Sequence, residues 1–212
     1  MAVAAGEKRG LRESFADFLH RSAGQPRDDR IVEGIVSLVP AAETMLDVGA
    51  SDGRVASRVA ERVGAAVEGI DVELQPDARI PVTVYDGTTF PFADDQYDLV
   101  TIVDVLHHAG DPRAVLAEAF RVTRPGGCVV IKDHVRRGRW SNFVLLTMDR
   151  SSNFGVHENT SGTYLTSSEW DALIVDAGGR VEQKVWPFKI HDLPWKLVAP
   201  SSYHLLLQLR AA

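Results

Sequence analysis

Cysteine is almost absent from this chain of 212 residues, in which Cys128 is the only one. A single cysteine excludes a disulfide within the chain and a metal site built from several cysteines. We therefore expect no metal centre, and a reducing cytoplasmic location.

Long apolar runs and an excess of positive charge are also missing. No stretch reaches the ~18 consecutive apolar residues that span a bilayer. The first residues are charged, with Glu7, Lys8 and Arg9, which excludes a secretory signal there. The formal net charge is -6, which disfavours a partner such as the nucleic-acid backbone. These absences argue against a nucleic-acid or membrane partner. We expect a small-molecule substrate and a monomer or homodimer.

What is present is an alternation of short Val- and Ile-rich runs with amphipathic helical patterns, typical of βαβ units and a parallel sheet. Strands are predicted at residues 44–49, 66–71, 81–85, 97–103, 127–133, 180–186 and 203–210. Helices are predicted at residues 29–39, 53–63, 111–122 and 168–177. The sequence therefore predicts an α/β fold.

Four parts of the chain are distinguished by these patterns. Residues 1–28 are predicted to be an N-terminal helical arm, and residues 29–135 a ligand-binding core. Residues 136–166 are polar with scattered aromatics and follow a strand, where open α/β sheets place their ligands, so a lid or substrate insertion is expected there. Residues 167–212 would complete the core with a helix and two strands.

The loop after the first strand is the most informative stretch, and it reads MLDVGASDG over Met45–Gly53. Small residues let a ligand approach the backbone closely. The G-x-G-x-x-G pattern of dinucleotide oxidoreductases fails here. The G-x-S-x-G pattern of hydrolases matches through Ser51, but only helical sequence precedes it, whereas such an elbow usually follows several strands.

Three aspartates lie at or near the ends of three successive predicted strands: Asp47, Asp71 and Asp86. Any one of them is explained by the capping of a turn. An acidic side chain at the end of the second strand can also accept hydrogen bonds from a ribose diol. One nucleoside ligand lying across the three strand ends would explain all of them.

The ordered motifs from Asp29 to Asp133 resemble those of class I S-adenosylmethionine-dependent methyltransferases, in the small-molecule branch that includes quinone-biosynthesis enzymes. The motifs are Asp47–Gly53, Gly69–Asp71, Tyr85–Gly87, Phe90–Phe92, Tyr97–Val100, Val105–His108 and Arg124–Gly127. One departure is Ser51, which stands where the family loop usually has its middle glycine.

The resemblance implies a Rossmann-like sheet of seven mostly parallel strands, covered by helices on both faces, with the last strand antiparallel. It implies S-adenosyl-L-methionine as cofactor and a methyltransferase activity. It assigns the cofactor site, from the methionine end to the adenine, to Asp47, Gly49, Ala50, Ser51, Gly53, Asp71, Val72, Asp86, Gly87, Thr88, Val103 and Asp104.

A hydroxyl acceptor usually needs a base near neutral pKa. His134 follows Asp133 at the end of the fifth predicted strand, so His134 is our candidate base and Asp133 its orienting carboxylate; His157 in the insertion is a second candidate. For His107 and His108 a structural role is expected. We predict methyl transfer to a small molecule, with oxygen favoured; the alternatives are a non-catalytic binding module and an esterase that uses Ser51.

Overall fold

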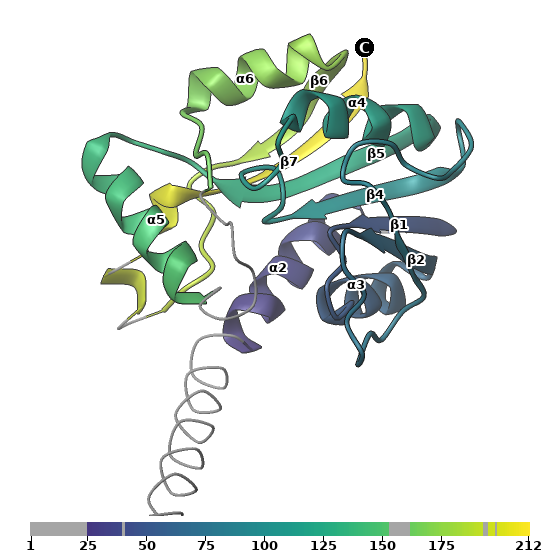
Figure 1. The fold of residues 1–212 in the computed structure, drawn as a ribbon, viewed down its shortest axis with the longest axis horizontal. Coiled ribbons are helices and arrows are strands. Elements are labelled where there is room, and N and C mark those ends of the chain that lie inside the picture. Colours follow the sequence, from purple (N-terminus) through teal and green to yellow (C-terminus); the bar gives the residue numbers. More distant parts are fainter. Residues whose placement is uncertain (1–24, 40, 153–161, 193–194, 198) are drawn as a thin grey trace, which may run out of the picture.

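The computed structural model describes residues 25–39, 41–152, 162–192, 195–197 and 199–212 (Figure 1). Most of the predicted N-terminal arm and the candidate base His157 lie outside the described residues. None of the helices in the described ranges combines the length and the apolar character that crossing a membrane requires.

One seven-stranded sheet forms the centre of the fold, in the order β3-β2-β1-β4-β5-β7-β6. The strands are β1 (Thr44–Val48), β2 (Ala66–Asp71), β3 (Val82–Val84), β4 (Tyr97–Val103), β5 (Thr123–His134), β6 (Gly179–Val185) and β7 (His204–Ala211). Neighbours from β3 to β5 pair in parallel, and β7 is antiparallel to both β5 and β6. The fold class expected from the resemblance is confirmed.

Helices cover both faces of this sheet (Figure 1). On one face, α4 (Pro112–Val122) and α6 (Ser167–Asp176) bury Leu116 and Trp170 against the strands. On the other, α2 (Gln25–Leu38) and α3 (Arg54–Val63) bury Ile35 and Val59. With helices on both sides, the central strands are apolar throughout rather than alternating, which is the pattern the sequence showed.

Local sequence explains where these helices begin. Asp111 caps α4 by accepting from the backbone N–H of Ala114 at 3.0 Å. A capping box of Thr166 and Glu169 starts α6. Helix α2 is described from Gln25 onward, four residues before the predicted start at residue 29.

One helix was not predicted: α5 (Arg139–Ser152) lies within the insertion after β5. Its outward side carries Trp140 and Phe143, so the sequence lacks the usual separation of an apolar inner face from a polar outer face. Its assignment as part of a lid stays a prediction.

The antiparallel direction of β7 decides which residues share the ligand edge of the sheet. Its first residue, His204, pairs with His134, the last residue of β5. The start of β7 therefore lies at the same edge as the carboxyl ends of the parallel strands, where open α/β sheets bind ligands.

Candidate active site

The loop between β1 and α3 folds as the small residues predict. Gly49 and Gly53 have φ of 71° and 68°, and a side chain at Gly53 would meet Ile80 Cγ1 at 2.7 Å. Both positions therefore need glycine. Ser51 also adopts a left-handed conformation, with φ of 49°. The residue that departs from the family pattern thus occupies a conformation that glycine would adopt with less strain.

Asp47 lies at the end of β1 and is buried, with its Oδ1 accepting from Thr101 Oγ1 at 2.5 Å. Burial raises the pKa of Asp47 to about 7, against the lowering effect of the Thr101 hydrogen bond, and the charge of Asp71 raises it further. A carboxylate held in this way favours a cationic or hydrogen-bond-donating ligand.

Asp71, the second of the three aspartates, binds the loop between β1 and α3. Asp71 Oδ2 accepts from the backbone N–H of Ser51 at 2.7 Å, which joins the end of β2 to the loop after β1. Asp86 Oδ1 accepts from the N–H and hydroxyl of Thr88, at 2.7 and 2.8 Å, and from the N–H of Thr89. These hydrogen bonds lower the pKa of Asp86. They also show that Asp86 caps its turn, which is the explanation that applies to any single one of the three aspartates.

These carboxylates suit the cofactor that the resemblance implies. None of Asp47, Asp71 and Asp86 forms an ion pair with a lysine or arginine among the described residues. Val72, which is 59% exposed, lies against Gly87, where an added Cβ would be 3.4 Å from Val72 Cγ1. Unneutralised carboxylates beside an exposed apolar residue fit a cationic nucleoside such as S-adenosylmethionine.

Beyond β4, Asp104 is held by two cations. Its Oδ1 lies 2.5 Å from Nζ of the fully buried Lys132, and its Oδ2 pairs with Arg27 at the start of α2. Burial raises the pKa of Asp104, but the charges of Lys132 and Arg27 outweigh it and hold the pKa well below its usual range. Asp104 is thus a fixed negative charge at the predicted methionine end, next to Val103, and no sequence pattern indicated its partners.

The structure pairs Asp133 with His107 rather than with the ring of His134. His107 Nδ1 lies 2.6 Å from Asp133 Oδ1, and both side chains are buried. The ring nitrogen Nδ1 of His134 lies 3.4 Å from carboxylate oxygens of Asp133 and of Asp104, while the backbone N–H of His134 donates to Asp133.

The two histidines differ in basicity. Burial lowers the pKa of His107, but the charge and hydrogen bond of Asp133 outweigh burial and raise it above the ordinary value. Burial and the charge of Lys132 lower the pKa of His134. A carboxylate-oriented imidazole with a raised pKa is the better base near neutral pH. His107 therefore competes with His134 for the catalytic role.

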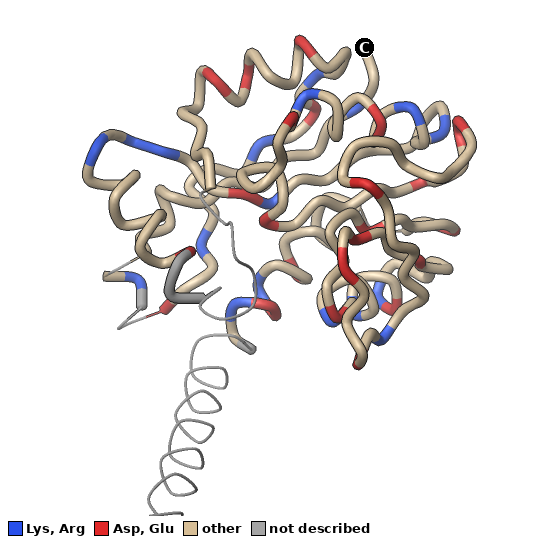
Figure 2. Tube along the Cα trace, in the orientation of Figure 1, with Lys and Arg blue, Asp and Glu red and all other residues tan. Residues whose placement is uncertain are grey.

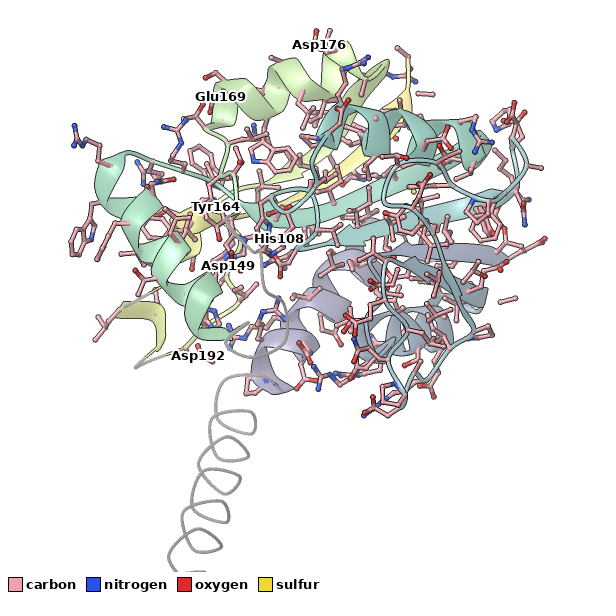
Figure 3. The ribbon with its side chains drawn as sticks, in the orientation of Figure 1. His108, Asp149, Tyr164, Glu169, Asp176 and Asp192 are labelled. Atoms are coloured by element: carbon pink, nitrogen blue, oxygen red, sulfur yellow. The ribbon has the colours of Figure 1, made fainter. Side chains whose placement is uncertain are left out.

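Helix α5 and residues 162–166 lie beside His107 and Asp133. Figure 3 shows His108, Asp149 and Tyr164 together between α5 and the strand ends. His108 Nε2 lies 3.3 Å from Asp149 Oδ1, and the Tyr164 ring stacks on His107 with centroids 5.1 Å apart. The Tyr164 hydroxyl donates to the carbonyl oxygen of Leu145 at 3.3 Å. No sequence pattern distinguished Tyr164, because its position depends on how the insertion packs back.

His191 and His204 also lie at this edge of the sheet, and no sequence pattern predicted their positions. The ring of His204 lies 5.0 Å from that of His134 and 5.7 Å from that of His191. Burial is the main cause that lowers the pKa of both, to about 4 for His191. The pKa values of His134, His191 and His204 are therefore all lowered, whereas that of His107 is raised.

The spacing of four ionisable side chains at this edge of the sheet would suit a metal ion. Ligand atoms of Asp104, His107, Asp133 and His134 lie within 4.8 Å of one another. Lys132 and Arg27 already pair with Asp104, and His107 pairs with Asp133, so a divalent cation would add uncompensated charge in a buried site. The donor set therefore fits a hydrogen-bonded acid–base group better than a metal centre.

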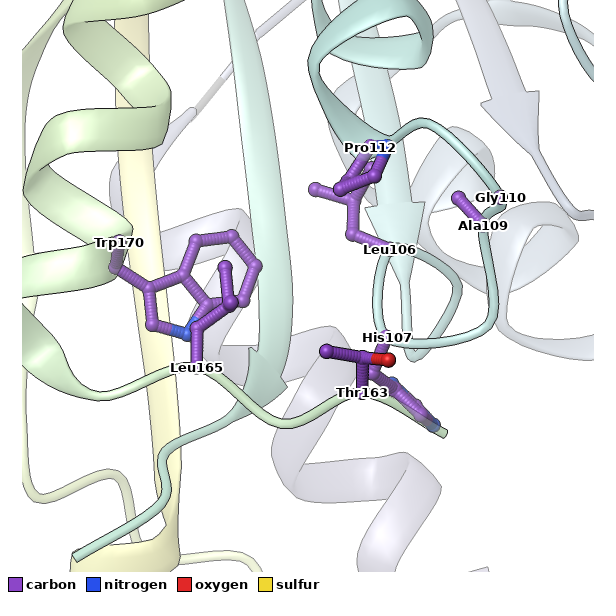
Figure 4. Close-up of a pocket in the computed structure, with 8 residues that line it drawn as sticks. All are labelled: Leu106, His107, Ala109, Gly110, Pro112, Thr163, Leu165 and Trp170. Atoms are coloured by element: carbon purple, nitrogen blue, oxygen red, sulfur yellow. The ribbon is translucent and has the colours of Figure 1, made fainter. Parts of the chain in front are cut away.

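A cavity of about 130 Å³ opens beside His107 (Figure 4). It is mostly apolar, and its walls come from the segment after β4, from residues 163–165 and from α6. The lining residues are Leu106, His107, Ala109, Gly110, Pro112, Thr163, Leu165 and Trp170.

Three arginines of the insertion, Arg136, Arg137 and Arg139, differ in their contacts. Arg136 donates to the carbonyl oxygen of Tyr164 at 2.9 Å and pairs with Glu169 at 2.9 Å, so it ties residues 162–166 to α6. Arg137 and Arg139 are exposed. Among the described residues, neither of them has an ion pair to a carboxylate within 4.0 Å.

Comparison with known proteins agrees with this geometry. Residues 46–131 match a family described as "Methyltransferase domain". The chain is 32% identical over 154 residues to "Methyltransferase GfsG" of Streptomyces halstedii, which covers 60% of the chain and 55% of the relative. It is 36% identical over 122 residues to "Demethylmenaquinone methyltransferase" of Renibacterium salmoninarum, which covers 53% and 50%. The chain thus spans about half the length of these curated relatives.

Solved structures share the fold across nearly the whole chain. A SAM-dependent methyltransferase from Thermotoga maritima superposes with a TM-score of 0.64 at 17% identity, over 96% of this chain and 97% of that one. The [4+2]-cyclase SpnF superposes with a TM-score of 0.63 at 16% identity, over 86% and 81%. A cyclase with this fold shows that architecture alone does not define the reaction.

The fold defines the chain as a Rossmann-like α/β protein, and its strand-end carboxylates fit a nucleoside ligand. These comparisons confirm the resemblance to the class I S-adenosylmethionine-dependent methyltransferases that the sequence showed. S-adenosylmethionine is the cofactor that these comparisons imply.

Proposed function

We propose that this chain transfers the methyl group of S-adenosylmethionine to a hydroxyl group on a small, largely apolar molecule, with His107 as the general base. The observation that carries the proposal is the buried pair of His107 Nδ1 and Asp133 Oδ1, 2.6 Å apart at the carboxyl edge of the sheet. A hydroxyl must lose its proton as it is methylated, whereas an amine acceptor need not meet a base at this point.

The cofactor would lie across β1, β2 and β4. Asp71 would accept from the ribose hydroxyls, and Asp86, with Gly87 and Thr88, would face the adenine. Asp47 and the loop Gly49–Gly53 would hold the methionine end. The cofactor supplies an electrophilic methyl group on a positively charged sulfur. Support for this placement comes from the carboxylates, which no described lysine or arginine neutralises.

The chain's own residues would position and deprotonate the acceptor. Asp133 is a positioning residue: its Oδ1 binds His107 Nδ1 and so leaves Nε2 as the basic atom of the ring. Tyr164 fixes the ring plane by stacking. The apolar cavity beside His107 would hold the body of the acceptor, because its walls are mainly Leu106, Pro112 and Trp170. Holding the hydroxyl and the methyl group at near-attack distance supplies much of the acceleration.

Variants of the two competing histidines test the choice of base. Release of the demethylated cofactor is measured with a panel of phenols and hydroquinones. His107→Ala should lower kcat by about 10²–10⁴-fold, whereas His134→Ala should lower it by less than about tenfold. Calorimetric binding of the demethylated cofactor should persist in both variants, which controls for folding.

A larger loss in His134→Ala than in His107→Ala would return the catalytic role to His134, as first predicted from the sequence. Cofactor binding without turnover on any acceptor would instead support the non-catalytic binding module. The esterase alternative has little support, since Ser51 Oγ has no histidine partner among the described residues.

A further inference from the structure

The outward face of α5 carries two large aromatic side chains that the core does not use. Trp140 is 71% exposed and Phe143 is 59% exposed, and their rings lie 5.7 Å apart. The inward face is already packed, because Leu145 is buried and accepts from the Tyr164 hydroxyl through its carbonyl oxygen. The two aromatics therefore form an apolar patch that folding alone does not explain.

Positive charge surrounds this patch. Arg137 and Arg139 are exposed just before and at the start of α5, where Figure 2 shows a basic stretch of the chain. The Arg137 guanidinium lies 5.9 Å from the ring centre of Trp186, which is itself 39% exposed. From residue 136 to residue 147 the sequence contains no aspartate or glutamate. The patch is thus aromatic and basic on a chain whose net charge is -6.

The chemistry of the patch selects its partner. About a two-fold axis through the patch, a second copy would bring its own Arg137 and Arg139 into the same interface, where the four like charges repel. Tryptophan and phenylalanine beside arginine are the residues that amphipathic helices place at the boundary of lipid headgroups and acyl chains, and anionic lipids attract the arginines. An anionic bilayer surface satisfies both features together.

We propose that α5 is a membrane-docking helix, which places Trp140 and Phe143 in the interfacial layer of an anionic bilayer with Arg137 and Arg139 on its headgroups. Such a contact lies on the membrane and does not span it, so the lack of a long apolar run bears only on spanning. This docking goes beyond the proposed methyl transfer and does not depend on it.

The position of α5 gives the docking a consequence. The helix follows β5 directly, and Asp149 near its end contacts His108 beside the candidate base. A bilayer bound at the outer face of α5 would therefore lie next to the acceptor edge of the sheet. Acceptors that partition into membranes would be concentrated there.

Co-sedimentation of the full chain with lipid vesicles tests the proposal. Vesicles contain phosphatidylglycerol mixed with phosphatidylcholine, or phosphatidylcholine alone. We expect sedimentation with the anionic vesicles only, and less of it at high salt. Trp140→Ala/Phe143→Ala and Arg137→Glu/Arg139→Glu should each lower the partition coefficient by more than about tenfold, because each basic residue at an anionic surface contributes roughly fivefold.

Two surface variants outside the patch serve as matched controls. Arg113→Glu on α4 reverses an exposed arginine, and Val175→Ala on α6 truncates a side chain that is 69% exposed. Both should bind vesicles as the unchanged chain does. Quenching of tryptophan fluorescence by brominated lipid should occur in the unchanged chain and fall in Trp140→Phe.

The proposal fails if the chain does not sediment with anionic vesicles, or if the patch variants sediment as well as the controls. It also fails if light scattering shows a dimer that Trp140→Ala/Phe143→Ala converts to a monomer without any vesicle binding, since the face would then join copies of the chain.

Discussion

Asp47→Asn isolates the cost of keeping an ionised carboxylate inside the cofactor site. Burial raises the pKa of Asp47 from 3.8 to about 7, with Thr101 opposing and Asp71 adding to the rise. About three pKa units correspond to roughly 4 kcal/mol of unfavourable free energy when the group is ionised in the folded state. Asparagine has nearly the same shape and cannot ionise, so it removes this cost.

The sign of the effect follows from the direction of the shift. A carboxyl whose pKa is raised on folding favours the folded state below its unfolded pKa, and this contribution is lost as the pH rises through about 7. Asp47→Asn should therefore raise the free energy of unfolding of the ligand-free protein by up to roughly 4 kcal/mol at pH 8, and by little near pH 4. Urea unfolding at each pH measures the difference.

Binding should change in the opposite direction. If Asp47 holds the methionine end of the cofactor, Asp47→Asn should weaken binding of the demethylated cofactor by about tenfold or more, since hydrogen bonds to charged groups contribute ~1.5–3 kcal/mol. The reasoning is refuted if the variant is less stable than the unchanged chain at pH 8, or equally more stable at pH 4 and pH 8.

Three further variants test neighbouring parts of the site. Thr101→Val removes the hydrogen bond that lowers the pKa of Asp47, so urea unfolding at pH 8 should show a loss of about 1–3 kcal/mol; no change would mean that the bond is not formed. Asp71→Ala should weaken cofactor binding at least about tenfold by calorimetry, and unchanged affinity would place the ribose elsewhere. Ser51→Gly should raise stability by roughly 1 kcal/mol, because it relieves a left-handed φ; a lower melting temperature with unchanged turnover would contradict this.

The elements of the fold followed from local patterns because their causes are local. Strands β1, β2 and β4 are short runs rich in Val, Ile and Leu, and the side chain of Asp111 caps α4 at the start of its predicted helix. Helix α5 was missed because exposed Trp140 and Phe143 break the expected polar outer face. The pattern of its apolar residues does not show which face packs on the core, if a partner covers the exposed ones.

The candidate site was predictable on the cofactor side and less so on the acceptor side. Asp47, Asp71 and Asp86 each follow a strand in a fixed order, so chain position alone brings them to one edge. The partner of Asp133 was expected to be its neighbour His134. In the structure the ring that pairs with Asp133 is that of His107, which follows β4 rather than β5.

The sequence by itself determined the alternation of strands and helices, the loop from Asp47 to Gly53, and the resemblance of the chain to its family, because each depends on short-range order along the chain. Only the tertiary structure decided which ionisable groups meet. The antiparallel entry of β7 brings His204 to His134, and the packing of α2 brings Arg27 to Asp104 and Lys132. Contacts between residues far apart in the chain set the charges there, since burial and partners fix each pKa.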